Sequence, residues 1–158
     1  MSKPGRKRLQ ALVILLAGVF LNACSSNAIR GEAPFVQVNG WTLDGQRLTL
    51  ELRLRNVNDE PLEVRGITLD GTVDGSTALF RHQQTLDFDD AAGGFESLTL
   101  ETTASEDGAA LMMRLEQRER PNLAYRLRGT ISSDDSGELA VSVDGRMYTV
   151  PGRPGNFR

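Results

Sequence analysis

Few side chains in this sequence could carry out covalent or metal chemistry. Cys24 is the only cysteine and His82 the only histidine, so a disulfide within one chain is excluded and a zinc site, which needs several such ligands, is not predicted. The sequence contains no nucleophile-elbow motif, in which a serine lies between two glycines. Only carboxylates remain as acid–base groups, and most of them fall in predicted turns. We expect no catalytic activity, no cofactor and no metal site; a hydrolase acting on cell-wall or lipid material is the enzymatic alternative.

Two clusters of aspartates could supply oxygen ligands for calcium. Asp87, Asp89 and Asp90 precede the run Ala91-Ala92-Gly93-Gly94, and Asp134-Asp135 precedes Ser136-Gly137. Neither cluster has the ligand spacing of a calcium loop with its closing glutamate. We therefore predict that both are solvated turns, in which short polar side chains bond to their own backbone.

The amino terminus has the pattern of a secretory signal. Basic residues at positions 3–8 precede Ala11–Leu21, an unbroken apolar run. A membrane-spanning helix needs about 20 apolar residues, so this run is too short to span and favours export. The run is followed closely by Cys24.

The segment Leu21-Asn22-Ala23-Cys24 resembles the lipobox of bacterial lipoproteins, although Asn22 stands where a small or hydroxylated residue is usual. The resemblance implies that the signal peptide 1–23 is removed. Cys24 then becomes the first residue and carries a diacylglycerol on its thiol and an acyl chain on its amino group. Several acyl chains anchor a protein to a membrane essentially permanently. The alternative is a free cysteine after an ordinary cleaved signal.

Ser25 resembles the sorting pattern of lipoproteins sent to the outer membrane of Gram-negative bacteria, which predicts an outer-membrane protein facing the periplasm. Removing residues 1–23 leaves 14 arginines against 21 acidic residues, a net charge of −7. This charge argues against nucleic acid as a partner and against unassisted docking on anionic lipid. Membrane attachment is therefore assigned to the lipid on Cys24.

Alternating apolar and polar residues predict that the rest of the chain is mostly β-strand. The clearest case is Gln46–Leu62, in which four leucines at every second position are followed by a loop rich in Asn, Asp and Pro. We expect residues 24–33 to be a flexible tether, residues 34–151 the domain and residues 152–158 a disordered tail. Other strands are predicted at 35–43, 64–73, 77–81, 85–88, 95–103, 123–131, 139–143 and 146–150.

One helix interrupts the strands. Ser105 can cap it, Glu106 and Asp107 fall in its first turn, and residues 109–118 carry apolar side chains that include Met112 and Met113. We expect the methionines to pack against the strands, and Pro121 to end the helix. The pattern as a whole predicts an all-β antiparallel sandwich with one short α-helix.

Three positions carry more specific predictions. In a regular count Val64 and Ile67 fall on opposite faces of their strand, so an extra residue near Gly66 is expected to form a β-bulge. Asp144-Gly145 is expected to be a hairpin turn. Trp41, the only tryptophan, is expected in the core.

The order of several short motifs resembles the late-embryogenesis-abundant (LEA) type 2 family and its WHy (water stress and hypersensitive response) domain. Asn56-Val57-Asn58 is similar to the family's Asn-Pro-Asn and is followed by Pro61-Leu62, and Tyr125–Gly129 is similar to a late strand of the family. Val57 departs from the usual central proline. The resemblance implies an immunoglobulin-like or fibronectin-III-like sandwich and supplies no catalytic residue. It implies that Asn56 and Asn58 form a loop.

Plant and bacterial members of that family are associated with desiccation and stress protection. We therefore expect a non-enzymatic, lipid-anchored envelope protein that protects or binds envelope components. The alternative is a pilotin-like lipoprotein that assists assembly of a secretion or pilus machine. In either case an exposed sheet edge could pair with an extended segment of a protein partner.

Overall fold

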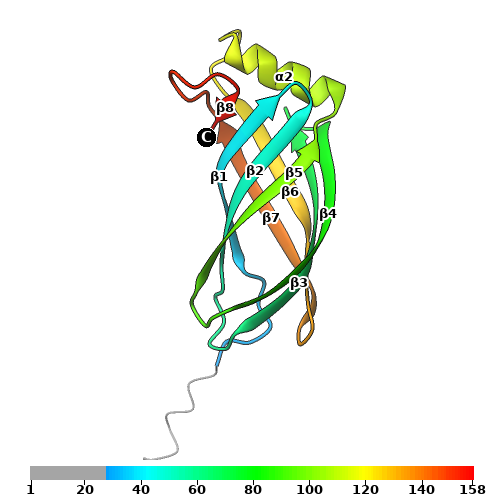
Figure 1. Ribbon diagram of the computed structural model, residues 1–158, viewed down its shortest axis with the longest axis vertical. Helices are drawn as coiled ribbons and strands as arrows, with labels where there is room; N and C mark the ends of the chain where they lie inside the picture. Colours follow the sequence, from blue (N-terminus) through cyan, green and yellow to red (C-terminus); the bar gives the residue numbers. More distant parts are fainter. Residues whose placement is uncertain (1–27) are drawn as a thin grey trace, which may run out of the picture.

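Two antiparallel sheets and one helix make up residues 28–158, the part of the chain that this computed structural model describes (Figure 1). The predicted signal peptide and Cys24 lie outside the described residues. The elements are β1 (Phe35–Asp44), β2 (Arg47–Arg55), β3 (Leu62–Val73), β4 (Thr77–Asp90), β5 (Phe95–Thr103), α2 (Glu106–Glu116), β6 (Leu123–Ser133), β7 (Gly137–Met147) and β8 (Asn156–Phe157).

The strands are ordered β5-β2-β1-β8 in one sheet and β4-β3-β6-β7 in the other. Tight hairpins join β1 to β2, β3 to β4 and β6 to β7, whereas the loops after β2, β4 and β7 pass from one sheet to the other. The prediction of an all-β antiparallel sandwich with one short helix is confirmed. Within residues 28–158 no helix has the length and apolar character needed to cross a membrane.

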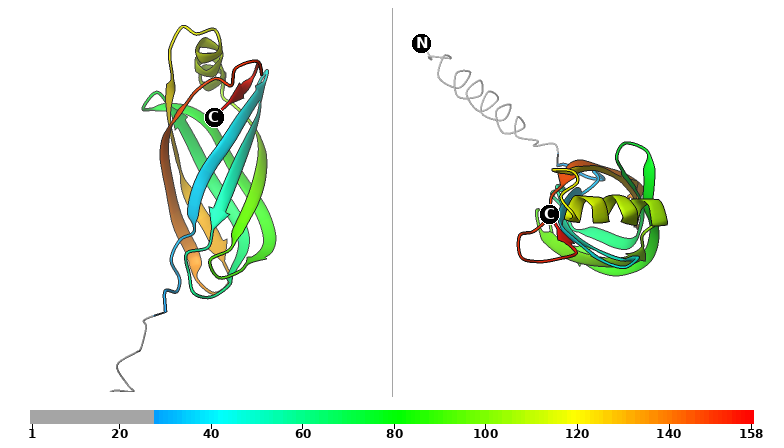
Figure 2. Two further views of the ribbon diagram at one scale, coloured as in Figure 1. Left: turned by 90° about the vertical axis from the view of Figure 1, so that its left-hand side faces the viewer. Right: turned by 90° about the horizontal axis from the view of Figure 1, so that it is seen from above.

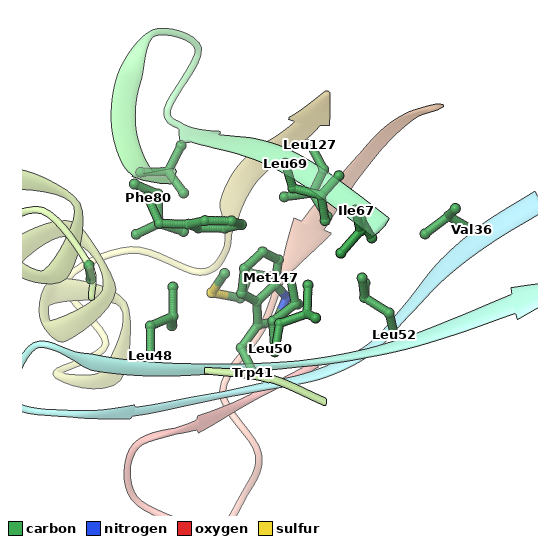
Figure 3. Packing of buried hydrophobic residues seen from close by; sticks show 14 of the residues in the cluster. Val36, Trp41, Leu48, Leu50, Leu52, Ile67, Leu69, Phe80, Leu127 and Met147 are labelled. Atoms are coloured by element: carbon green, nitrogen blue, oxygen red, sulfur yellow. The ribbon is translucent and has the colours of Figure 1, made fainter. Parts of the chain in front are cut away.

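The core lies between the sheets because each strand buries every second side chain. In β2 all four leucines are buried, and the residues between them face outward. Figure 3 shows side chains from both sheets pointing toward one another, among them Leu50, Ile67 and Trp41. Trp41 is 2 % exposed, and its ring meets that of Tyr125 edge to face at 5.2 Å between centroids. The prediction that Trp41 belongs to the core is confirmed.

Helix α2 covers one end of the sandwich, and the segment that precedes β1 enters at the opposite end (Figures 1 and 2). As predicted, Ser105 caps the helix by accepting a hydrogen bond from the Gly108 N–H at 3.0 Å. Met112 is buried at the end of the core, whereas Met113 is 46 % exposed. The helix ends at Glu116, before Pro121, because Arg118 adopts a positive φ of 61°.

The predicted bulge at Gly66 is confirmed. The registers of β3 with β4 and with β6 both shift between Val64 and Gly66. A Cβ at Gly66 would lie 2.7 Å from the Ser132 side-chain oxygen, so the close approach of the two strands requires glycine there.

The predicted hairpin at Asp144-Gly145 is wrong, and so is the strand expected at 146–150. Strand β7 runs straight through this dipeptide, and Gly145 lies opposite Tyr125 of β6. The ring of Tyr125 fills the space that a side chain on Gly145 would need. The glycine therefore serves side-chain packing here, and the Asp-Gly pair makes no turn.

Two further predictions fail because strand pairing extends farther than the local sequence pattern indicates. Residues 77–81 and 85–88 are parts of one strand, β4, which pairs with β3 along its whole length. The tail 152–158 is ordered by pairing: Asn156–Phe157 form β8 beside β1, and Phe157 is 2 % exposed. A dipeptide strand has no periodicity that a sequence could reveal.

Candidate functional site

A groove of about 520 Å³ opens between the two sheets, where β1 and β7 face each other. One wall is the segment Ala33–Val36 at the start of β1, and the other is Ala140–Asp144 of β7. Val57, from the loop after β2, completes the lining. The groove therefore lies along the side of the sandwich, in the half that is remote from helix α2.

Both walls of the groove are strand edges with no partner strand. β7 is the outermost strand of its sheet, and its 11 residues pair with β6 in an unbroken register. On the other wall, β8 pairs with β1 only at Trp41 and Thr42. The edge of β1 between Phe35 and the bulge at Val38–Gly40 therefore has no partner strand on this side. Unpaired backbone N–H and C=O groups on such edges are templates for an added strand.

On the opposite side of the sandwich, between the outer strands β4 and β5, hydrogen bonds connect the two sheets at the helix end. There the backbone N–H of Ser105 donates to the Leu79 carbonyl at 2.7 Å, and the Ser105 hydroxyl donates to the Ala78 carbonyl at 2.6 Å. These bonds join the connection after β5 to the start of β4. That side is therefore bridged near α2, whereas the groove lies on the β1–β7 side.

The groove is apolar inside and polar at its rim. Val36 and Val141 are buried at its base, and Phe35 is exposed over 61 % of its surface at the mouth. Asp144 at the rim is paired with Arg126 of the adjacent strand. Such a surface can hold an extended polypeptide through backbone hydrogen bonds and apolar side chains.

Asn56 and Asn58, the motif asparagines, are buried and bind backbone. The Asn56 amide donates to the carbonyls of Glu60 and Asp90 at 2.8 and 3.0 Å, and its oxygen accepts from the Asn58 N–H at 2.9 Å. The prediction that they form the loop is confirmed, because both amides are occupied with shaping it. Their geometry leaves them no free group for a ligand.

The same loop holds the segment that precedes β1. The Asn58 side chain exchanges two hydrogen bonds with the backbone of Glu32, at 2.9 and 3.0 Å. Asp59 does the same for Ile29: its carboxylate accepts from the Ile29 N–H at 2.7 Å, and its own N–H donates to the Ile29 carbonyl at 3.0 Å. The predicted flexible tether 24–33 must therefore be corrected, because from Ile29 onward the chain is fixed to the domain.

The cluster Asp87, Asp89 and Asp90 is part of strand β4, so its prediction as a solvated turn is wrong. Asp90 is buried and its carboxylate accepts from the Asn56 N–H at 3.1 Å. Burial raises the pKa of Asp90, the Asn56 bond opposes this, and the charge of Glu96 adds to it. The sequence could not separate Asp90 from its neighbours, because only the long-range pairing with β3 turns it inward.

Asp87 and Asp89 instead surround Arg65, whose guanidinium also reaches Glu63 at 2.8 Å and Asp134 at 2.7 Å. The hydrogen bond that the Arg65 guanidinium donates to Asp134 raises the pKa of Arg65 further above its ordinary value. Asp134 and its neighbour Asp135 do lie in a turn, as predicted. The arginine occupies the position that a cation would take between these carboxylates.

In the described part of the chain no group of side chains has the arrangement needed to hold a metal ion. His82 contacts the Gln84 side chain at 3.2 Å on the outer strand β4, and among the described residues no hydrogen bond or ion pair joins it to a carboxylate. The groove itself contains a single carboxylate, Asp144, which is already paired with an arginine. A catalytic role for the groove therefore has no supporting constellation.

Comparison with solved structures identifies the fold. The solution structure of AT1g01470 from Arabidopsis thaliana superposes with a TM-score of 0.52 over 78 % of this chain and 83 % of that protein, at 10 % sequence identity. This chain shares its fold with that plant protein. Two other solved structures superpose less closely. At2g46140.1, described as a candidate LEA protein, gives a TM-score of 0.45 at 13 % sequence identity and covers 94 % of this chain and 87 % of its own. A protein from Archaeoglobus fulgidus gives a TM-score of 0.45 at 10 % sequence identity and covers 73 % of this chain and 96 % of its own. No protein-family model and no curated protein sequence matches this chain.

Sequence reasoning did not find the groove. Its walls come from residues that are 100 positions apart along the chain, and strand patterns do not reveal which edges stay unpaired. The one available signal was the alternation of Leu139, Val141 and Val143, which placed these side chains on one face without locating the edge.

Proposed function

We propose that this chain is a non-enzymatic, lipid-anchored protein of the bacterial cell envelope, with a LEA type 2/WHy-like sandwich that binds an extended segment of another envelope protein. The observation that carries the proposal is the groove between the two unpaired edges of β1 and β7. The anchor is the lipid on Cys24, and Ser25 directs the protein to the periplasmic face of the outer membrane.

In the proposed complex the bound segment adds to β7 as a further strand. Each backbone hydrogen bond contributes about 0.5–1.5 kcal/mol net of the bonds lost to water. Apolar side chains of the segment enter the groove and contribute about 25 cal/mol for each Å² of apolar surface that they bury. Since backbone groups supply much of the binding, sequences of several kinds can be accommodated, which suits a protective role under envelope stress.

Photo-crosslinking in cells tests the binding site. A photoreactive residue is placed at Ser142, which is exposed on β7, and in a separate strain at Gln83, which is exposed on β4, the other outer strand of the same sheet. Adducts formed from Ser142 and absent from Gln83 would support the proposal. Equal yields at the two positions, or none at Ser142, would contradict it.

A pair of edge substitutions gives a second readout. Ala140→Lys and Ser142→Lys each place a charge on the exposed face of β7, a device by which natural edge strands resist pairing. Both should reduce the adducts obtained from a probe at Val57 in the groove lining, whereas Gln83→Lys should leave them unchanged.

The number of adduct species separates two roles: one partner at a fixed ratio indicates a pilotin-like assembly factor, and many partners indicate general protection.

The anchor is tested by mass spectrometry of the protein extracted from membranes. The amino-terminal peptide should begin at Cys24 and carry a diacylglycerol and an amide-linked acyl chain, and the Cys24→Ser variant should lack both. A mature chain that begins elsewhere would refute the anchor and leave the groove as a separate question.

A further inference from the structure

Four large apolar side chains are exposed around the end of the sandwich at which the amino-terminal segment enters. Ile29, Phe35, Val57 and Phe95 belong to this group, and of the exposed large apolar residues in the described part of the chain only Met113 and Tyr148 lie elsewhere. Helix α2 occupies the opposite end (Figure 1). Exposed apolar residues that gather at one end of a domain mark a contact surface.

Two of these residues form one row with an arginine on the outer face of the β5-β2-β1 sheet. Arg55 of β2 lies opposite Phe35 of β1 on one side and opposite Phe95 of β5 on the other. Arg53, on the same face of β2, places its guanidinium 4.0 Å from the centre of the Phe95 ring. We call these four residues, Phe35, Arg53, Arg55 and Phe95, the aromatic–arginine patch.

The patch is positively charged although the chain as a whole is acidic. Among residues 28–158 neither Arg53 nor Arg55 has an ion-pair partner, and the first acidic residue on this face of β2 is Glu51. Glu96 follows Phe95 directly but alternates to the other face of β5. Other charges at this end lie off this face: Arg30 is paired with Glu60, Asp59 is bonded to Ile29, and the carboxylates around Arg65, together with Asp135, belong to the other sheet and its turn.

The attachment of the amino-terminal segment brings this end close to the proposed anchor. Ile29 is fixed to Asp59 by two hydrogen bonds, so only five peptide steps separate Cys24 from a fixed point of the domain. Such a stretch reaches at most about 18 Å even when fully extended. A lipid on Cys24 would therefore hold this end of the sandwich within about 18 Å of the anchored residue.

We infer that the aromatic–arginine patch binds the surface of the membrane in which the protein is anchored. The two phenylalanine rings enter the boundary between headgroups and acyl chains, and the two guanidinium groups bind phosphate oxygens of anionic phospholipids. This inference rests on the lipid anchor of the proposed function. Its consequence is an orientation: the patch side of the sandwich leans on the membrane, the mouth of the groove at Phe35 lies close to the membrane, and helix α2 remains accessible from the periplasm.

Lipid-borne quenchers test this orientation in the lipidated, full-length mature protein. Because Cys24 is blocked by its thioether, a fluorophore can be attached to one introduced cysteine. Ser97 lies beside the patch on the outer face of β5, Asp135 lies in the turn at the same end but on the other sheet, and Asp107 lies in α2 at the far end. The protein is reconstituted into phosphatidylethanolamine–phosphatidylglycerol vesicles that contain spin-labelled lipid.

Quenching should be strongest at Ser97, weaker at Asp135 and absent at Asp107. Two double variants test the patch: one carries Phe35→Ser with Phe95→Ser, and the other carries Arg53→Glu with Arg55→Glu. In both, quenching at Ser97 should fall to the level seen at Asp135. Both pairs of side chains are exposed, and Trp41 fluorescence verifies that the fold is kept. Equal quenching at Ser97 and Asp135, or quenching that the variants do not change, would refute the patch while leaving the anchor intact. A chain without acyl groups would refute both the anchor and the inference.

Discussion

The ring of Tyr125 on β6 lies across Gly145 of β7 and makes an edge-to-face contact with Trp41 of β1. One aromatic side chain thus joins three strands from both sheets near the end covered by helix α2. Burial of this ring also raises the pKa of the Tyr125 hydroxyl. The arrangement depends on the missing side chain at position 145.

Gly145→Ala should therefore destabilise the protein. The added methyl group forces the Tyr125 ring toward Trp41, and overpacking of this kind costs about 1–3 kcal/mol in the free energy of unfolding. Urea denaturation followed by Trp41 fluorescence measures it. Ser142→Ala on the exposed face of β7 is the control. In a Tyr125→Ala background the same glycine substitution should cost almost nothing; an equal cost there would show that the ring is not the cause.

The Asp144-Gly145 pair shows where sequence patterns fail. Locally it has the composition of a hairpin turn, and only the position of a tyrosine 20 residues earlier reveals its other use. Alternation correctly predicted β2, β5 and β6, because in each strand every second side chain turns toward the core, although in β5 only Leu100 is fully buried. The extent of β4 and the groove could not be predicted, since both depend on which strands become neighbours.

Phe157 is predicted to be essential for stability although it is the penultimate residue. Its ring is buried beside Trp41, and the Asn156–Phe157 segment supplies the only strand that covers that edge of β1 in the described structure. Phe157→Ala should lower the free energy of unfolding by about 3–5 kcal/mol, the usual cost of removing a buried phenylalanine. Arg153→Ala, at an exposed position, is the control for thermal unfolding. A variant as stable as the parent would show that the tail does not pack in solution.

Asn58→Ala should release the segment that precedes β1. The substitution removes both bonds to the Glu32 backbone and the bond to the Asn56 oxygen, and leaving such groups unpaired costs about 1–3 kcal/mol. Hydrogen exchange at residues 30–33 should become faster. Glu60→Ala, which removes an exposed ion pair with Arg30, should change exchange little. If exchange in this segment were fast in the parent protein as well, the segment would be a flexible tether after all.

Asp90 should make the protein less stable as pH rises. Burial raises its pKa in the folded state, so between its ordinary value of about 3.9 and the raised value the folded protein binds more protons than the unfolded one. The free energy of unfolding therefore decreases as pH rises through that interval and stays lower above it. Asp90→Asn, which still offers an oxygen to the Asn56 N–H, should remove this decrease.

Asp74 provides a comparison of opposite sign for the pH dependence. The hydrogen bond from Arg120 lowers the pKa of Asp74, so its contribution to stability is present above the ordinary aspartate pKa and is lost as pH falls through the lowered one. Urea midpoints measured from pH 3 to pH 8 should thus separate the two variants: Asp90→Asn removes the decrease that begins as pH rises above the ordinary aspartate pKa, whereas Asp74→Asn reduces the loss of stability as pH falls below it. Because Asp74 is solvent-exposed, its effect should also weaken in high salt, whereas that of the buried Asp90 should persist. Parallel responses of the two variants to salt would mean that Asp90 is solvated, and the inward turn of β4 at that residue would then be wrong.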